Sequence, residues 1–152
     1  MWVKKLKIMF FAFSIACLLM LITPITYTEK PIKPYEDKFL NIVLQYCDKN
    51  EINFPSSRVL VFDELDTNDY IAYCAKNPLK FSVIFDKGTW DSYNPEYRYQ
   101  LVFHELSHCY LDQEHIDYNK HYMFPYMNKL SIDKVNQQLI EILKEKCTKW
   151  KR

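Results

Sequence analysis

All four histidines of this 152-residue chain lie in one short stretch, between His104 and His121. The first two stand four residues apart in the order His-Glu-x-x-His, with Glu105 next to the first of them. On an α-helix, residues four apart share one face, so His104 and His108 can point their imidazoles at a single metal ion. The spacing predicts a helix through this stretch and a metal site on one of its faces.

Zinc suits this pattern of residues. It takes neutral imidazole nitrogens as ligands, and a catalytic zinc uses three protein ligands and keeps one position for water. Glu105 would sit beside that water rather than on the metal. There it can act as general base, because zinc lowers the pKa of the water toward neutrality. The motif therefore predicts Zn²⁺ as cofactor, His104 and His108 as ligands and Glu105 as the catalytic residue.

The residues in front of the motif favour a helix. The run 97–103 contains no Pro or Gly and is apolar enough to form one buried face. Asn94 is a candidate N-cap, Pro95 suits the first helical position and Glu96 makes the first turn acidic. We expect this active-site helix to end near Leu111.

The third ligand is inferred from a resemblance. His104 to His115 resembles the segment H-E-L-G-H-C-x-L-x-x-x-H of small secreted or lipoprotein-type zinc metallopeptidases, which are similar to metzincins, with Ser107 in place of Gly. The resemblance implies that His115 is the third ligand. The metzincin pattern H-E-x-x-H-x-x-G-x-x-H instead puts its Gly at Leu111 and its third His at Glu114. Since zinc also accepts a carboxylate, Glu114 is the alternative ligand.

The resemblance extends over roughly residues 70 to 127. Upstream it includes the segment 84–86, Trp90 and Arg98, and downstream it includes Tyr122-Met123-Phe124-Pro125. The downstream segment resembles the Met-turn that underlies the metal site in metzincins, with Met123 as the Met-turn residue and Met127 in reserve. An ordinary core methionine is the alternative for Met123. The resemblance implies a zincin-like fold and hydrolysis of peptide bonds.

Residues 1–28 are predicted to be a targeting segment. Three lysines precede an apolar run over 8–22, as in a signal peptide, and extension of this run to residue 27 reaches about the minimum length of a membrane-spanning helix. The segment 14–17 faintly resembles a lipobox ending at Cys17. We expect export in every case, with the segment cleaved, lipidated or retained as a membrane anchor. Residues 29–152 would form one zinc metallopeptidase-like domain outside the cytoplasm.

The periodicity of this domain predicts a small α+β fold. A helix is expected over 35–50, three strands over 58–64, 70–74 and 80–86, and a closing helix over 131–149. Turns are expected at 66–69, 77–78 and 87–89. We expect a mixed sheet of three or slightly more strands, backed by two helices and accompanied by the active-site helix. Phe81 to Phe85 is the candidate for an open sheet edge that pairs with an extended substrate, and an interior strand is the alternative.

Other polar residues near the site have open roles. His121 can contact the substrate or lie exposed in a loop. Tyr118, Tyr122 and Tyr126 are candidates for stabilising a transition state through a phenol hydroxyl. Glu141 and Glu145 could imitate a glutamate ligand, but their helical positions favour solvated side chains.

Four of the five cysteines lie outside the targeting segment, at positions 47, 74, 109 and 147. An even number in an exported chain favours disulfides, and three pairings are possible. The family resemblance implies that Cys74 pairs with Cys109, which leaves Cys47 for Cys147. We do not expect Cys109 to bind the metal, because one residue past His108 it is turned about 100° away on a helix.

The charge of the chain bounds its partners. Removing the three lysines of the targeting segment from the 20 basic residues leaves 17 against 19 acidic ones, or −2, with no basic run that would bind nucleic acid. The expected partners are a peptide or protein substrate and, through an uncleaved N-terminal segment, the membrane; the sequence leaves the oligomeric state open. The alternative functions are a non-catalytic zinc-binding module and a membrane-anchored envelope interaction protein.

Overall fold

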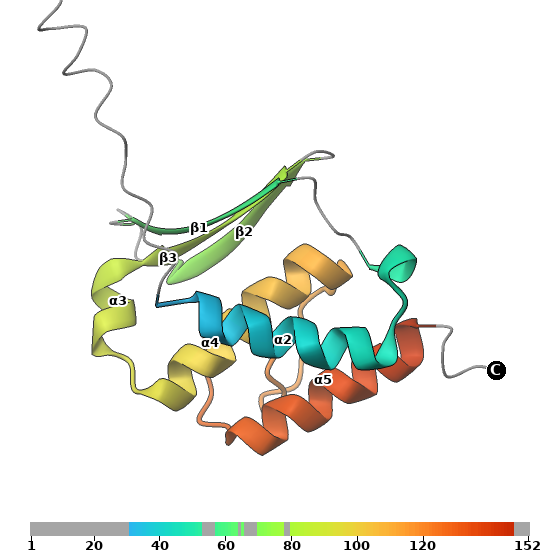
Figure 1. Cartoon of the computed structure of the whole chain (residues 1–152). Helices are drawn as coiled ribbons and strands as arrows, with labels where there is room; N and C mark the ends of the chain where they lie inside the picture. The colour runs from blue at the N-terminus through green and yellow to red at the C-terminus, as the bar shows by residue number, and fades with distance from the viewer. Residues whose placement is uncertain (1–30, 53–56, 64, 66–69, 78–79, 148–152) are drawn as a thin grey trace, which may run out of the picture.

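A computed structural model describes residues 31–52, 57–63, 65, 70–77 and 80–147. The elements follow in the order α2 (Lys33–Tyr46), η1 (Lys49–Glu51), β1 (Ser57–Asp63), β2 (Ala72–Asn77), β3 (Lys80–Asp86), α3 (Lys87–Ser92), α4 (Pro95–Leu111) and α5 (Ile132–Lys146). One small mixed sheet lies over the helices, which confirms the predicted α+β class (Figure 1). The predicted targeting segment 1–28 and the predicted turn 66–69 lie outside the described residues. Within the described ranges, no helix has the length and apolar character needed to cross a membrane.

The sheet has the strand order β1-β3-β2. β1 runs parallel to β3, with Arg58 opposite Phe81, and β2 runs antiparallel to it, with Ala72 opposite Phe85. The prediction that Phe81 to Phe85 forms an open edge is therefore wrong, and the alternative of an interior strand holds, because β3 is hydrogen-bonded to a strand on both sides. The side chains of Phe81, Val83 and Phe85 are buried against the helices. In the part of the chain that the structure describes, the open edges are β1 and β2, and β2 is the edge that packs on α4.

Three elements begin or end at other residues than predicted. The second strand begins at Ala72 rather than Tyr70 and continues to Asn77. The expected turn at 87–89 is instead the first turn of α3, because the Asp86 side chain caps it by accepting from the Thr89 amide at 2.6 Å. α2 ends at Tyr46 rather than at residue 50, since the backbone is already extended at Cys47.

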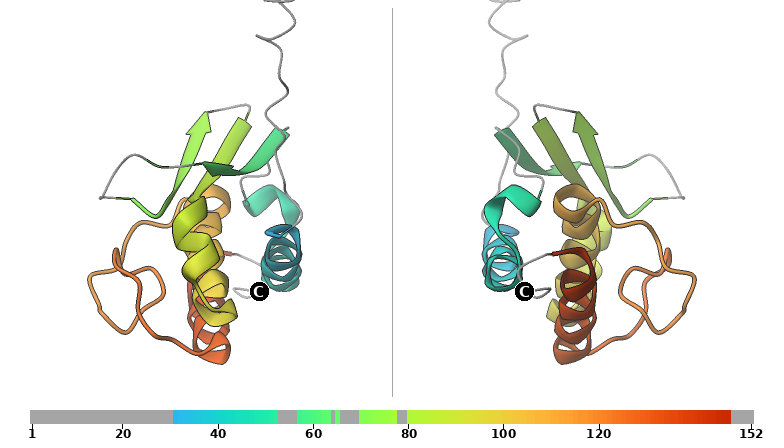
Figure 2. Two further views of the ribbon diagram at one scale, coloured as in Figure 1. Left: turned by 90° about the vertical axis from the view of Figure 1, so that its left-hand side faces the viewer. Right: turned by 90° about the vertical axis from the view of Figure 1, so that its right-hand side faces the viewer.

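Helix α4 is the centre of the core. Most of its residues are buried, α5 packs along it on the side away from the sheet, and α2 lies beside it (Figure 2). Aromatic rings join it to its neighbours: Phe103 meets Phe39 of α2 edge-on at 5.3 Å between ring centroids, and Tyr110 meets Phe81 of β3 at 4.8 Å. A helix held on several sides is a rigid base for a site.

Two disulfides link the elements around α4. Cys74 of β2 is bonded to Cys109 of α4, and Cys47 at the end of α2 is bonded to Cys147 at the end of α5. Both pairings agree with the expectation from the family resemblance. Such bonds are typical of proteins that fold in an oxidising compartment.

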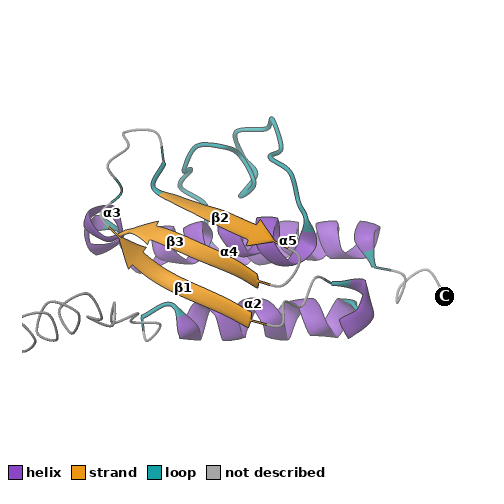
Figure 3. Cartoon of the chain, turned by 90° about the horizontal axis from the view of Figure 1, so that it is seen from above, coloured by secondary structure: helices purple, strands orange, loops and turns teal. Residues whose placement is uncertain are grey.

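The segment 112–131 between α4 and α5 contains neither helix nor strand. It loops out on the side of β2, so that it lies beside the sheet edge and the C-terminal half of α4 (Figure 3). This placement brings residues 112–127 to the motif of α4.

Candidate metal centre

The helix that carries the motif starts and ends at the residues predicted from the sequence. The Asn94 side chain accepts from the Tyr97 amide at 3.0 Å and Pro95 follows it, as predicted for an N-cap and a first helical residue. The helix ends at Leu111, also as predicted, and Asp112 then adopts a left-handed conformation with φ of 49°. His104 and His108 therefore lie one turn apart near the end of a buried helix.

The three histidines 104, 108 and 115 come together. The Nε2 atom of His104 lies 3.1 Å from Nε2 of His108 and 3.2 Å from Nε2 of His115. One ligand nitrogen from each ring lies within 4.8 Å of the other two, so the cluster can hold a metal ion. Glu114, the alternative ligand, is exposed and stands outside this cluster.

Two of these rings are oriented by backbone carbonyls. His104 Nδ1 donates to the Tyr122 carbonyl at 2.8 Å, and His108 Nδ1 donates to the Gln113 carbonyl. Because a carbonyl oxygen only accepts, Nδ1 carries the proton in both rings and Nε2 presents its lone pair. The two Nε2 atoms lie 3.1 Å apart, and their lone pairs repel each other unless a cation lies between them. The pair of nitrogens therefore fits a metal ion.

Burial keeps the helix histidines neutral. Loss of water around His104 lowers its pKa to about 4, opposed by its bond to Tyr122 and assisted by the neighbouring histidines. Burial also lowers the pKa of His108, with help from His115 and Lys76. Neutral imidazole is the form that binds metals, so near neutral pH no proton has to leave these two rings first.

Glu105 is a buried carboxyl group beside the cluster. It is only 5% exposed and lines the same pocket as the three histidines. Burial raises its pKa to about 8, while the backbone N–H of Cys74 acts in the opposite direction. A cation next to it would favour the carboxylate and lower the pKa again. The group is thus placed to accept and release a proton.

A pocket of about 570 Å³ opens at the cluster. Its walls are formed by the three histidines, Glu105, residues 70–74, Pro125 and Tyr126. A second pocket adjoins it and shares Cys74, His108 and His115. The histidine cluster therefore lies in a depression that follows the edge strand β2 on both sides of the site.

The segment proposed as a Met-turn is tied to the site. The Tyr122 carbonyl holds His104, and the Met123 carbonyl accepts from the Ile116 amide at 2.9 Å, next to His115. Met123 is fully buried and Met127 is partly buried. The segment thus binds His104 directly and holds the backbone next to His115.

The remaining sequence candidates differ in position. Tyr126 lines the pocket, whereas Tyr122 is buried with its hydroxyl 2.9 Å from Ser107 Oγ, away from the pocket. Tyr118 is exposed but does not line either pocket. His121 is half-buried rather than exposed, and its Nδ1 accepts from the Met123 amide at 3.0 Å, so it stabilises the turn. The side chains of Glu141 and Glu145 are exposed, as predicted.

Sequence reasoning missed several residues around the cluster. Tyr70 and Tyr73 form part of the pocket wall, and Lys76 and Lys146 bind the end of α4. Their signal in the sequence is weak, because scattered tyrosines and lysines are common on surfaces. Asp112 had a clearer signal, since a helix ending at residue 111 needs a residue that can turn the chain.

No protein-family model, no curated protein and no solved structure matches this chain. The functional assignment therefore depends on the motif and on the geometry of the site.

Proposed function

We propose that this protein is a zinc-dependent metallopeptidase that hydrolyses peptide bonds, with His104, His108 and His115 as metal ligands and Glu105 as general base. The observation that carries the proposal is the convergence of three imidazole nitrogens on one point beside a buried carboxyl group. A purely structural zinc site would have no use for that carboxyl group. A bound zinc ion would supply Lewis acidity, which activates water and polarises a carbonyl.

The spacing of the nitrogens supports zinc as the metal. Tetrahedral zinc with bonds of 2.0–2.1 Å keeps two ligand nitrogens roughly 3.3 Å apart. The two spacings from His104, 3.1 and 3.2 Å, come within a few tenths of an ångström of this value, and all three nitrogens lie within 4.8 Å of one another. Imidazole ligands and a three-residue set are also typical of catalytic zinc.

Glu105 performs the proton transfers in this proposal. Its carboxylate takes the proton of the attacking water and later gives it to the leaving amine. The Cys74 N–H, which acts on the Glu105 carboxyl group, helps to fix it in the pocket wall. A disulfide holds Cys74 itself to α4 one turn after Glu105, so donor and carboxylate keep their relative positions.

The open edge of β2 supports an extended peptide as substrate. The Asp86 amide donates to the Ile71 carbonyl, so by the alternation of an antiparallel ladder Ala72, Cys74 and Lys76 turn their backbone groups away from β3. Of these groups, the Cys74 N–H is already engaged with Glu105. Such an edge can pair with an extended chain. The tyrosines 70, 73 and 126 would accept bulky apolar side chains on one side of the scissile bond.

The remaining features agree with this function. The segment at Met123 is taken as the Met-turn of a minimal zincin-like fold, because it underlies His104 and contacts the backbone next to His115. Two disulfides favour an oxidising compartment, so we infer that residues 1–28 direct the domain out of the cytoplasm and, if uncleaved, anchor it in the membrane.

The test combines metal content with peptidase activity for the full chain, Glu105→Gln and His115→Ala. We expect about one zinc per wild-type chain and cleavage of peptides, zinc without cleavage for Glu105→Gln, and loss of zinc for His115→Ala. Zinc binding with equal cleavage by Glu105→Gln would contradict the catalytic role. Zinc without any cleavage by the wild type would favour the non-catalytic zinc-binding module.

A further inference from the structure

The C-terminal end of α4 makes an unfavourable turn. Asp112 is the non-glycine residue with positive φ in the described part of the chain, with φ of 49° and ψ of 37°. Residues other than Gly adopt this left-handed conformation at an energetic cost, although Asp tolerates it better than most. Its carboxylate also lies at the negative end of the helix dipole, which disfavours an acid there. Surrounding contacts must therefore hold the turn.

This turn places two of the three metal-site histidines. Just after it, the Gln113 amide donates back to the Ser107 carbonyl at 3.1 Å. The Gln113 carbonyl then accepts from His108 Nδ1, and His115 follows two residues later with its Nε2 at the cluster. A change in the turn would therefore move the acceptor that orients His108 and the chain that carries His115.

Two lysines bind the carbonyls at this helix end. The Nζ atom of Lys76 donates to the His108 carbonyl at 3.2 Å and pairs with the Asp112 carboxylate. The Nζ atom of Lys146 donates to the Leu111 carbonyl at 2.8 Å and lies 3.5 Å from the Asp112 carbonyl. The last carbonyls of a helix have no partner within it, and cations are favoured there by the dipole. The two ammonium groups thus offset both unfavourable features of the turn.

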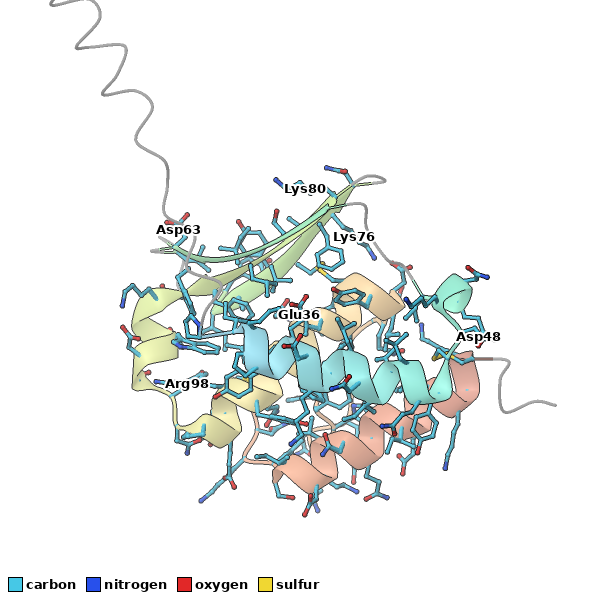
Figure 4. The ribbon with its side chains drawn as sticks, viewed as in Figure 1. Glu36, Asp48, Asp63, Lys76, Lys80 and Arg98 are labelled. Carbon is cyan, nitrogen blue, oxygen red and sulfur yellow. A yellow bond between two sulfur atoms is a disulfide. The ribbon has the colours of Figure 1, made fainter. Side chains whose placement is uncertain are left out.

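Both lysines come from elements that a disulfide ties to a neighbouring element. Lys76 stands two residues after Cys74, which is bonded to Cys109 of α4, and Figure 4 shows it near the end of the sheet that lies over the C-terminal half of this helix. Lys146 precedes Cys147, which is bonded to Cys47 at the end of α2. Each ammonium group therefore reaches the turn from a fixed base, one from the sheet and one from α5.

We propose that Lys76 and Lys146 are positioning residues for the metal site: they clamp the carbonyls at the end of α4 and so hold the left-handed turn that orients His108 and delivers His115. The inference rests on the proposed function only because it takes the histidine cluster to be the metal site. Neither lysine touches the metal or the substrate in this role, and each acts through the turn alone.

The experiment compares the full chain with Lys76→Ala, Lys146→Ala, the double variant, and the double variant carrying Asp112→Gly. Lys144→Ala is the matched control, because Lys144 is an exposed lysine of the same α5 turn. The first readout, in the metal-free protein, is the tautomer of His108 from the ¹⁵N chemical shifts of its ring. The second is the zinc affinity from competition with a chelator.

We expect the wild type and Lys144→Ala to hold the proton of His108 on Nδ1. Each single variant should weaken zinc binding about threefold and the double variant at least about tenfold, with His108 shifting toward the Nε2–H tautomer because its carbonyl acceptor moves. Asp112→Gly should restore most of the affinity to the double variant, since Gly adopts the left-handed turn without a clamp. A general loss of stability would be neither repaired at residue 112 nor visible in the tautomer.

An unchanged tautomer and an unchanged zinc affinity in the double variant would overturn the inference and leave the proposed function intact. A loss of affinity that Asp112→Gly does not repair would overturn it as well. Failure of the wild type to bind zinc would overturn the proposed function instead, and the tautomer of His108 would still decide whether the lysines hold the turn. The single variants keep one clamp and both disulfides, so the test survives if the double variant does not fold.

Discussion

The metal centre joins two regions that are built in different ways. His104 and His108 stand on a buried helix whose start and buried face are set by nearby residues, whereas His115 stands exposed on the return segment 112–131, which contains neither helix nor strand. The helix places the two imidazoles on one face, and carbonyls of the return segment orient their rings. The return segment itself depends on Lys76 of β2 and Lys146 of α5, which bind the end of α4, and on the bond from the Ile116 amide to the Met123 carbonyl. The comparison teaches that the motif alone brings two ligands and Glu105 together, whereas the third ligand reaches the site only through contacts between distant segments.

The largest expected effect is a loss of catalysis without a loss of zinc, caused by a substitution on the helix itself. Glu105→Gln should lower kcat by roughly 10²–10⁴-fold, because the amide cannot take the proton of water, while zinc content stays unchanged. Peptide cleavage and metal analysis of the same sample measure both. Glu114→Gln, on the return segment, is the control and should keep its activity, since that side chain is exposed outside the cluster. Equal losses in the two variants would refute the distinct role of Glu105.

Acid should destabilise the metal-free protein through the helix histidines. The pKa of His104 is about 4 in the folded chain against 6.5 for the unperturbed group, so the unfolded state binds more protons between these values. Stability is therefore full above about pH 6.5 and falls as the pH drops to 4, by about 3 kcal/mol from this residue.

Urea unfolding at several pH values measures this loss. The same titration on His104→Gln should show a shallower dependence on pH, because the group that takes up the proton is gone. A slope that is identical in the two proteins would show that His104 is not held neutral in the folded state.

Removal of each ligand should distinguish the two regions in the metal-free state. His104→Ala leaves the Tyr122 carbonyl without its partner and opens space in the core, so it should cost about 1–3 kcal/mol of unfolding free energy. His115→Ala should stay within about 0.5 kcal/mol of the wild type, since His115 is exposed. Thermal unfolding of the metal-free proteins measures the difference, and both variants should lose zinc. A larger cost for His115→Ala than for His104→Ala would invert the comparison.

The smallest expected effect lies in the pocket wall. Tyr126→Ala should reduce kcat/KM for peptides with bulky apolar side chains by about tenfold or less, because one aromatic contact in an open pocket contributes roughly 1 kcal/mol. Zinc affinity should not change, since Tyr126 lies in the wall and not among the ligands. Tyr118→Ala is the matched control, an exposed tyrosine outside both pockets. Equal effects of the two substitutions would remove Tyr126 from the binding surface.

The sequence predicted best where neighbouring residues decide the structure. The start of α4 followed from Asn94, Pro95 and the apolar run, because capping and periodicity act within a few residues. The two disulfides agree with the family resemblance, since the cysteine spacing alone left three pairings open.

Prediction failed where distant segments decide. The order β1-β3-β2 put β3 in the middle of the sheet, and nothing within residues 80–86 distinguishes a central strand from an edge strand that is buried on one face. Lys76 and Lys146 reach α4 from β2 and α5, so their role is visible only when these elements are packed together. The role of His121 in the turn could not be predicted for the same reason, because its bond to the Met123 amide depends on the fold of the turn.

The most direct test of a metal centre made of two helix histidines and one loop histidine is the zinc X-ray absorption spectrum of the full chain and of His115→Ala. We predict three imidazole nitrogens at about 2.0–2.1 Å in the wild type and no signal from protein-bound zinc in the variant. A wild-type spectrum with fewer than three imidazoles, or with sulfur ligands, would contradict this arrangement. A variant spectrum identical to that of the wild type would exclude His115 as the third ligand.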